Sequence, residues 1–102
     1  MAIVQLIEIP IVGDDRTTTN YDAMMDKLGV DGNKPEGLIV HTAGWDDEGG
    51  VFRILDVWES AEAWERFRAD RLDPVLAEGP VNPDNAAPPS ADRSYELHKM
   101  VS

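Results

Sequence analysis

The segment 37–60 constrains the fold of this chain most, because it contains two strand-like runs joined by a short acidic turn. The runs 38–40 and 51–57 are rich in β-branched and aromatic residues, which favour strands. Residues 46–50 (Asp-Asp-Glu-Gly-Gly) supply the turn, since glycine accepts the positive φ angle that hairpin loops require. The sequence therefore predicts a β-hairpin. Three side chains within its apolar strands are candidates for chemistry: His41, Asp56 and Trp58.

Residues 2–11 predict an earlier strand, ended by Pro10 and the turn that follows it. One side of this strand carries Ile3, Gln5, Ile7 and Ile9, and the other carries Val4, Leu6 and Glu8. Both sides are mainly apolar, which indicates a sheet that is covered on both faces.

Two helices are predicted around the hairpin. The first begins near the N-cap Thr19 or a neighbour and ends at Gly29. Its apolar stripe consists of Tyr21, Met24, Met25 and Leu28. The second begins at the N-cap Ser60, and Pro74 is expected to kink or break it near Asp73.

The remaining residues predict a loop and a last strand, which give the order of all the elements. Residues 80–92 contain four prolines and predict an irregular loop, and residues 93–101 predict a last strand. The order strand, helix, strand, strand, helix, strand predicts one α+β domain over residues 1–102. This is the ferredoxin-like βαββαβ fold, a four-stranded antiparallel sheet with both helices on one face.

The expected sheet has one apolar face that the two helices cannot cover. A second copy of the chain is the simplest cover, so we expect a homodimer with a shared barrel-like interior. The same argument also allows a heteromeric partner.

Composition narrows the choice of partners and compartment. The formal net charge is −11, from 9 basic and 20 acidic residues, so we expect no nucleic-acid partner and no membrane partner. There is no cysteine, which excludes disulfides and thiol chemistry. The lack of cysteine fits a cytoplasmic protein, which is the compartment we expect. The apolar start lacks a basic leading segment and a small-residue cleavage site, so it is interpreted as a strand and not as a signal peptide. The sequence also lacks a glycine-rich phosphate loop, HExxH, GxSxG and a dinucleotide fingerprint.

The register of the hairpin decides what Asp56 does. A buried carboxylate needs a partner, and one register sets Asp56 beside His41. A slip by one residue sets His41 beside Leu55 and sends Asp56 to the opposite face. In the first register, the carboxylate fixes the imidazole tautomer and makes His41 a stronger general base. The alternatives are a structural histidine and a carboxylate bonded to Arg53, Arg68 or Lys99.

Several aromatic and histidine side chains are candidates for binding a flat ligand. Trp58 is the expected pocket wall, and the others are Phe67, Trp45, Tyr95 and His98. Each has an ordinary structural alternative in the core or at an edge, and Tyr95 and His98 fall on opposite sides of the last strand. His41, Asp56 and His98 form a metal-ligand set only in principle, because they lack recognisable spacing, so no metal is expected. Arg53, Arg68 and Arg71 are expected in surface ion pairs or on an acidic substrate group.

Six short segments spread over most of residues 2–102 form a recognisable pattern. They are Tyr21-Asp22-Ala23-Met24-Met25, Pro35-Glu36-Gly37-Leu38-Ile39-Val40-His41, Asp56-Val57-Trp58-Glu59-Ser60, Phe67-Arg68, Leu72-Asp73-Pro74 and Leu97-His98. The pattern resembles the dimeric α+β barrel superfamily, in particular small members of the antibiotic biosynthesis monooxygenase-like group. Some of these relatives oxidise aromatic compounds with oxygen and no cofactor, whereas others cyclise polyketides or degrade haem or chlorite. The resemblance thus implies a fold and not one activity.

The leading hypothesis combines this resemblance with the candidate base. It is a small secondary-metabolism enzyme for an aromatic or polyketide-like substrate, acting as a cofactor-independent monooxygenase. The alternatives are a polyketide cyclase or isomerase that uses the same base, a non-catalytic ligand-binding dimer, and a haem-degrading relative. The leading hypothesis expects no cofactor, and its partners are a second copy of the chain and a small hydrophobic or aromatic molecule.

Overall fold

The protein forms a four-stranded antiparallel sheet, and the computed structural model describes residues 1–12 and 16–101. The strands are β1 (Ile3–Pro10), β2 (Leu38–Asp46), β3 (Val51–Trp58) and β4 (Ala91–Glu96). Their order across the sheet is β2-β3-β1-β4, so the two central strands are β3 and β1. This is the ferredoxin-like α+β arrangement that the order of elements predicts.

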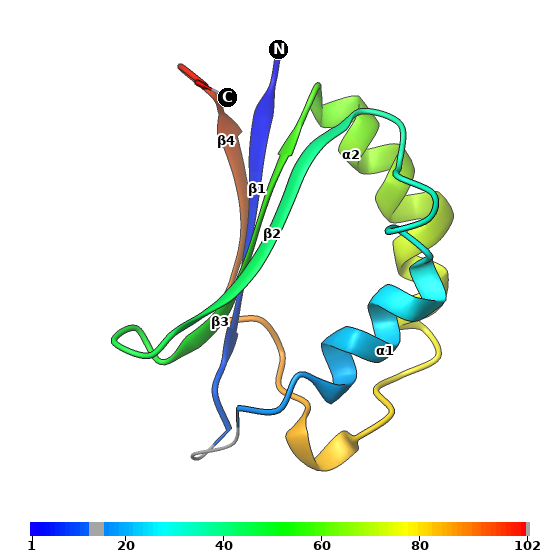
Figure 1. The fold of residues 1–102 in the computed structure, drawn as a ribbon, viewed down its shortest axis with the longest axis vertical. Coiled ribbons are helices and arrows are strands. Elements are labelled where there is room, and N and C mark those ends of the chain that lie inside the picture. Colours follow the sequence, from blue (N-terminus) through cyan, green and yellow to red (C-terminus); the bar gives the residue numbers. More distant parts are fainter. Residues whose placement is uncertain (13–15, 102) are drawn as a thin grey trace.

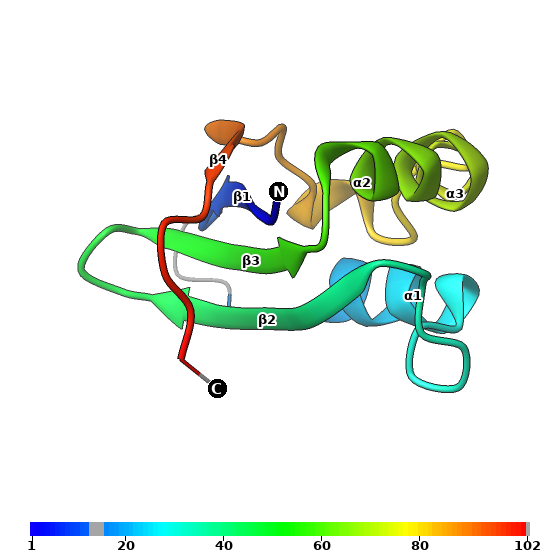
Figure 2. The same ribbon diagram turned by 90° about the horizontal axis from the view of Figure 1, so that it is seen from above.

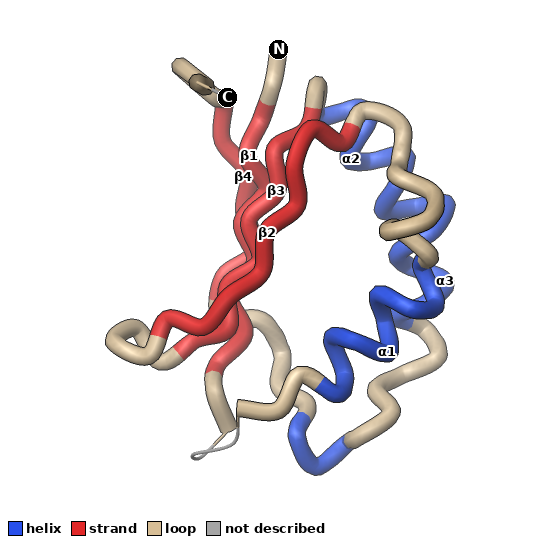
Figure 3. The backbone as a smooth tube through the Cα atoms, viewed as in Figure 1, coloured by secondary structure: helices blue, strands red, loops and turns tan. Residues whose placement is uncertain are grey.

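The helices lie together on one side of the sheet (Figures 1 and 3). They are α1 (Thr19–Leu28), α2 (Ala61–Phe67), the π-helical turn η1 (Arg68–Leu72) and α3 (Asp73–Leu76). A short 3₁₀ turn, η2 (Pro83–Asn85), lies in the loop before β4. None of the helices in the described part of the chain is long and apolar enough to cross a membrane.

The central hairpin has the register that pairs His41 with Asp56. Directly paired residues of neighbouring strands point to the same face, so both side chains point toward the helices. A bulge between Leu38 and Val40 shifts the register within β2. Leu38 therefore pairs with Trp58 on the helix side, although it lies an odd number of residues before His41.

The helix ends largely follow their sequence signals. Gly29 ends α1 with a φ angle of 64°, and the hydroxyl of Ser60 caps α2 by accepting a hydrogen bond from the Ala63 amide at 3.1 Å. The N-cap of α1 is Thr18, whose hydroxyl donates to Asp22 instead of accepting from the helix backbone. The predicted interruption is confirmed, because η1 separates α2 from α3 just before Pro74.

Aromatic side chains fill the contact between the sheet and α2. The core cluster consists of Ile3, Leu38, Trp58, Ala63 and Trp64. Trp58 is 1% exposed, and its ring centroid lies 5.7 Å from that of Trp64 and 5.2 Å from that of Phe67. These contacts fix the end of β3 that carries Asp56.

The last strand differs from the prediction at both ends. It covers Ala91–Glu96 instead of residues 93–101. Pairing stops there because Glu96 is opposite Ile3, the first residue of β1, and only one further bond follows, from the Leu97 amide to the Ala2 carbonyl at 2.9 Å. Residues 97–101 continue along the side of the sheet that faces away from the helices (Figure 1).

No helix of the described chain covers the second face of the sheet, as the view from above shows (Figure 2). Val40 and Tyr95 on this face are 41% and 50% exposed. Val4 and Val57, which pair with each other in the central strands, are buried in the single chain. The term "open face" is used below for this surface of Val4, Val40, Val57 and Tyr95.

Candidate active site

A histidine and a carboxylate form a hydrogen-bonded pair on the helix side of the hairpin. Nδ1 of His41 lies 2.6 Å from Oδ1 of Asp56. The side chains are 22% and 11% exposed, respectively. Of the two registers that the sequence allows, the structure has the one that brings these groups together, and Leu55 faces the opposite side.

Tyr21 extends this pair to three residues. Its hydroxyl lies 2.5 Å from Nε2 of His41, and its ring stacks parallel to the imidazole with centroids 6.0 Å apart. An edge contact with Phe52, at 5.1 Å between centroids, holds the same ring from the sheet. Tyr21 comes from the first turn of α1. The sequence predicts Tyr21 in the apolar stripe of that helix but not in the site, because helical spacing does not show which strand residue a side chain will meet.

The protonation states follow from the hydrogen bonds and the charges. The hydrogen bond to Asp56 raises the pKa of His41 above its ordinary value of 6.5, although burial acts in the opposite direction. Burial raises the pKa of Tyr21 above 10.0, and the charges of Asp56, Asp22 and Asp31 add to this effect. With His41 neutral, Nδ1–H donates to Asp56 and the Tyr21 hydroxyl donates to Nε2. The resting array is therefore fully hydrogen-bonded from the helix to the central strand.

The array borders a small cavity, called the inner cavity here, of about 60 Å³. Its lining also includes Trp58, Trp64 and Phe67. In the described part of the chain, Nε1 of Trp58 is a buried donor without a hydrogen-bond partner. Buried polar groups are usually paired, so this indole N–H of a cavity-lining residue lacks a partner that most such donors have.

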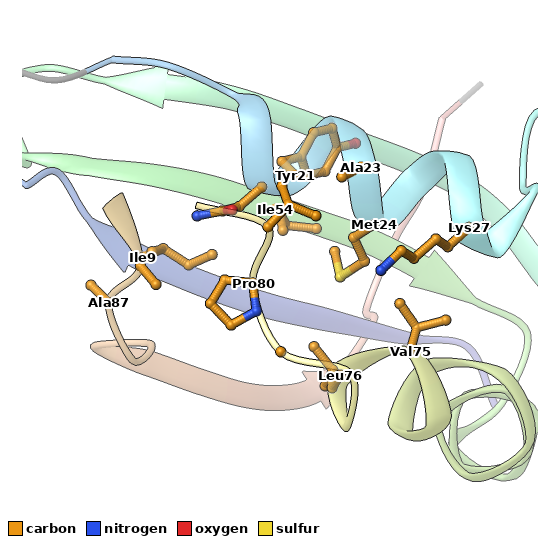
Figure 4. Close-up of a pocket in the computed structure, with 14 residues that line it drawn as sticks. Ile9, Tyr21, Ala23, Met24, Lys27, Ile54, Val75, Leu76, Pro80 and Ala87 are labelled. Carbon is orange, nitrogen blue, oxygen red and sulfur yellow. The ribbon is translucent and has the colours of Figure 1, made fainter. Parts of the chain in front are cut away.

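A second cavity, called the outer cavity here, lies beside the first and has a volume of about 270 Å³. It lies between the sheet, α1, α3 and the loop 79–87 (Figure 4). Most of its lining is apolar, and Figure 4 shows Tyr21 at the edge of the group of labelled residues, next to Ala23. Three residues line both cavities: Tyr21, Met24 and Ile54.

The other predicted binding residues do not all gather here. Phe67 lines the inner cavity with Trp58. Trp45 lies farther along the sheet, in edge contact with Phe52 at 4.9 Å, under the guanidinium of Arg16. Tyr95 belongs to the open face, and His98 is exposed in the segment after β4. The structure thus brings together His41, Asp56, Trp58 and Phe67, and leaves Trp45, Tyr95 and His98 outside this group.

The three arginines expected in ion pairs or on an acidic substrate group all make contacts within the protein. Arg53 pairs with Glu8 and Asp46, and Arg68 pairs with Glu65 and Asp73. Arg71 donates to the carbonyls of Leu28 and Asn33 after α1.

In the described chain, the histidine–carboxylate pair is not extended to a group of metal ligands. Within residues 1–12 and 16–101, no three His, Cys, Asp or Glu side chains gather closely enough to bind a metal ion. The partner of Asp56 is His41, not Arg53, Arg68 or Lys99 as in the alternatives above.

The order of elements and the sheet define the class of this chain, an α+β protein with the fold of the antibiotic biosynthesis monooxygenase-like proteins. A protein assigned to these monooxygenases, from Chloroflexus aurantiacus J-10-fl, is 13% identical with a TM-score of 0.67, covering 100% of this chain and 98% of its own. The haem degrader MhuD from Mycobacterium tuberculosis is 15% identical with a TM-score of 0.72, covering 98% and 99%. SnoaB, a cofactor-independent oxygenase from Streptomyces nogalater, is 10% identical with a TM-score of 0.65, covering 98% and 96%.

These similarities establish the fold over the whole chain. Neither a family model nor a curated protein sequence matches the chain. The similar structures include a haem degrader and a cofactor-independent oxygenase, so the fold alone does not select a reaction. The function has to be argued from the residues of the site.

Proposed function

We propose that this protein is a small enzyme that removes a proton from a phenolic or enolic apolar substrate and lets the resulting anion react directly with oxygen. The observation that carries the proposal is the Tyr21–His41–Asp56 array beside a cavity. A base is useful near neutral pH when its pKa lies close to that range, and the hydrogen bond to Asp56 raises that of His41. The cofactor-independent oxygenase SnoaB, which has the same fold, supports this choice of reaction.

The proton reaches His41 through Tyr21 in this proposal. Nε2 of His41 already accepts the hydroxyl of Tyr21, so a substrate cannot use that nitrogen directly. Instead, Tyr21 transfers its proton to Nε2 while its oxygen takes the proton of the substrate. Asp56 stabilises the imidazolium that forms, as the carboxylate of a catalytic triad does. In this proposal the indole N–H of Trp58, which has no partner in the described chain and belongs to a residue of the cavity lining, donates to the anionic substrate oxygen.

The oxygenation balances without an added reductant. For 1-naphthol, the naphtholate carbon opposite the oxygen reduces dioxygen and forms a C–O bond, and the peroxide anion takes the proton held by His41 to give a neutral hydroperoxide. His41, acting through Tyr21, then takes the remaining hydrogen of that carbon as a proton, which breaks the O–O bond and releases hydroxide. The hydroxide takes this second proton from His41 and leaves as water. One naphthol and one dioxygen thus give one 1,4-naphthoquinone and one water.

An oxygen electrode tests the proposal with 1-naphthol as the substrate, while absorbance follows the quinone. We expect oxygen uptake with the wild-type protein and its loss in His41→Ala and Asp56→Ala, whereas His98→Ala, the other histidine, retains it. Conversion of an enolic substrate without oxygen uptake would replace the oxygenase with the cyclase or isomerase that uses the same base. Binding without turnover would leave the non-catalytic ligand-binding dimer. A turnover that survives both site substitutions would rule out the array as the base.

Haem does not fit the site. Haem iron takes an axial protein ligand, often histidine, and both ring nitrogens of His41 are already hydrogen-bonded. His98 lies in the exposed segment after β4, away from the cavity lining. No step of the proposal uses haem, and a Soret shift on adding haem to the protein would contradict this assignment.

A homodimer belongs to the same proposal, with the open face as its interface. Val40 and Tyr95 give that face exposed apolar surface on two different strands. Both cavities are lined by residues of one chain, so each protomer carries its own site. We also assign the enzyme to secondary metabolism in the cytoplasm, with polyketide-like aromatics as the substrate class. The apolar cavities support the class of substrate, and the lack of cysteine supports the compartment.

A further inference from the structure

The inner cavity is too small for the substrate that its chemistry suits. Its volume of about 60 Å³ corresponds to about two water molecules. For comparison, an engineered protein cavity that binds one benzene molecule has a volume of about 150 Å³. An aromatic substrate therefore places only its polar atom beside His41 and Trp58, and its rings need space elsewhere.

The outer cavity offers that space. Its volume of about 270 Å³ exceeds what one benzene ring requires, and its lining comes mostly from apolar side chains. Its one lysine, Lys27, is already paired with Glu78 at 3.1 Å, so it does not favour an anionic ligand. The cavity thus suits a neutral body of one or two rings.

Three side chains line both cavities and separate them, and they differ in how firmly their conformations are held. Ile54 is buried in the central strand β3, and Tyr21 is held by His41 and Phe52. Met24 has no hydrogen bond to hold it and is an unbranched side chain with three rotatable bonds. Figure 4 shows its sulfur directed toward the middle of the outer cavity. Met24 is therefore the member of this partition that can move.

The outer wall of the larger cavity is a loop attached to α1. Asn20 donates to the carbonyl of Asn82 at 3.0 Å and accepts from its amide at 2.8 Å. These two bonds hold the loop 79–87 over the cavity that α1 and α3 border. The rings of a bound ligand would lie under this loop.

We propose that the outer cavity binds the rings of a neutral one- or two-ring phenol or enol, and that Met24 determines the ring size that reaches the array. The oxygen of the ligand passes Met24 and accepts a hydrogen bond from Nε1 of Trp58. This inference rests on the proposed function for the class of ligand, but it concerns binding and not turnover.

The test titrates the protein with 1-naphthol in the absence of oxygen and follows the indole N–H signals by NMR. The protein has three tryptophans, and Trp58→Phe assigns the signal of Trp58. We expect this signal to move downfield as the ligand binds, because its donor gains a partner. An unchanged signal, or no binding of 1-naphthol, would overturn the proposal.

Two variants fill the outer cavity from opposite walls. Val75→Phe fills it from α3 and Ala87→Phe from the loop, so one remains informative if the other does not fold. We expect either to weaken 1-naphthol binding by about tenfold or more, since a pocket that loses this much space rejects its ligand. Ala77→Phe is the matched control, because Ala77 is exposed and lies outside the cavity lining. Unchanged affinity in both filled variants would show that the rings bind elsewhere.

Met24→Ala tests the partition itself. Removing the side chain should join the two cavities, so we expect the variant to bind the three-ring phenol 1-anthrol, which the wild-type protein rejects. Equal ring-size preference in the two proteins would exclude Met24 as the determinant. Because binding is read without oxygen, these results can fail while the oxygen-uptake test succeeds, and the reverse also holds.

Discussion

Asp56 determines the chemistry of the site at the scale of single residues. It is a carboxylate that is 8% exposed inside an apolar strand, and His41 is the group that compensates its burial. We expect Asp56→Asn to lower the pKa of His41, because the asparagine cannot provide the charge and the strong acceptor. An NMR titration of the His41 ring protons measures this, with His41→Ala identifying the signal. An unchanged or higher pKa in the variant would contradict the assigned cause.

The raised pKa of His41 also predicts how the stability of the fold depends on pH. The pKa of His41 is raised in the folded state, so its contribution is complete below the unfolded value, about 6.5, and is lost as the pH rises through the folded value. We therefore expect the stability advantage of the wild type over Asp56→Asn to be larger at about pH 6 than at about pH 9. Urea unfolding at the two values measures it. A larger advantage at the higher pH would mean that His41 is not the group responsible.

Tyr21 makes the clearest prediction for activity. Tyr21→Phe keeps the ring contact with Phe52 and removes only the hydroxyl between the substrate and His41. We expect the rate of 1-naphthol oxidation to fall by about 10²–10⁴-fold, the usual contribution of a general acid–base group. Tyr95→Phe removes a hydroxyl from the open face and should retain the rate. A wild-type rate in Tyr21→Phe would show that the substrate reaches His41 by another route.

Part of this site could be predicted from the sequence, for a simple reason. A charged and a polar residue interrupt two apolar strands, and alternation leaves only two registers to choose from. The sequence does not decide between them, and alternation within the strand does not reveal the bulge between Leu38 and Val40. Tyr21 escapes prediction because it reaches His41 from an element 20 residues away.

At the scale of elements, Gly37 joins the hairpin to α2. Its carbonyl accepts from the Glu59 amide at 2.8 Å, and a Cβ atom at this position would lie 2.5 Å from Cβ of Ala63. Gly37 and Gly29 both have positive φ angles, of 88° and 64°, but nothing lies within 4 Å of a Cβ at Gly29. The two glycines therefore separate backbone strain from a steric clash.

We expect Gly29→Ala to cost about 1 kcal/mol of stability through its backbone conformation alone. Gly37→Ala should cost about 1–3 kcal/mol more, because Ala63 is buried and cannot move away easily. The free energy of unfolding in urea measures both changes. Equal costs would mean that α2 shifts to make room and that its position above the strands is not rigid.

The ends of the helices and strands show which boundaries can be predicted from local sequence patterns. Ser60, Gly29 and Pro74 act within one turn of the chain, so their effects follow from local chemistry. The end of β4 depends instead on where β1 begins, which alternation within residues 93–101 does not reveal. Apolar residues beyond Glu96 look strand-like in the sequence, but within the described chain they have no strand to pair with.

At the scale of the whole molecule, the open face is the feature that the single chain leaves unfinished. The two apolar sides of β1 predict it, and the structure shows helices on one side only (Figure 2). The sequence does not determine how much of this face packs within the sheet itself. Val4 and Val57 are buried in the single chain, whereas Val40 and Tyr95 on the two outer strands are exposed.

These edge residues provide the test of the proposed homodimer. Two copies that bury the open face bring together chains of net charge −11, so we expect the dimer to tighten with salt, which screens that repulsion. Val40→Glu combined with Tyr95→Glu should give a monomer in native mass spectrometry and sedimentation. The control is Val81→Glu, an equally exposed apolar residue on the helix side. A wild-type monomer, or a dimer that survives the double substitution, would remove the open face as the interface.

Because one chain lines both cavities, 1-naphthol should still move the Trp58 signal in a monomeric variant, which separates assembly from the site.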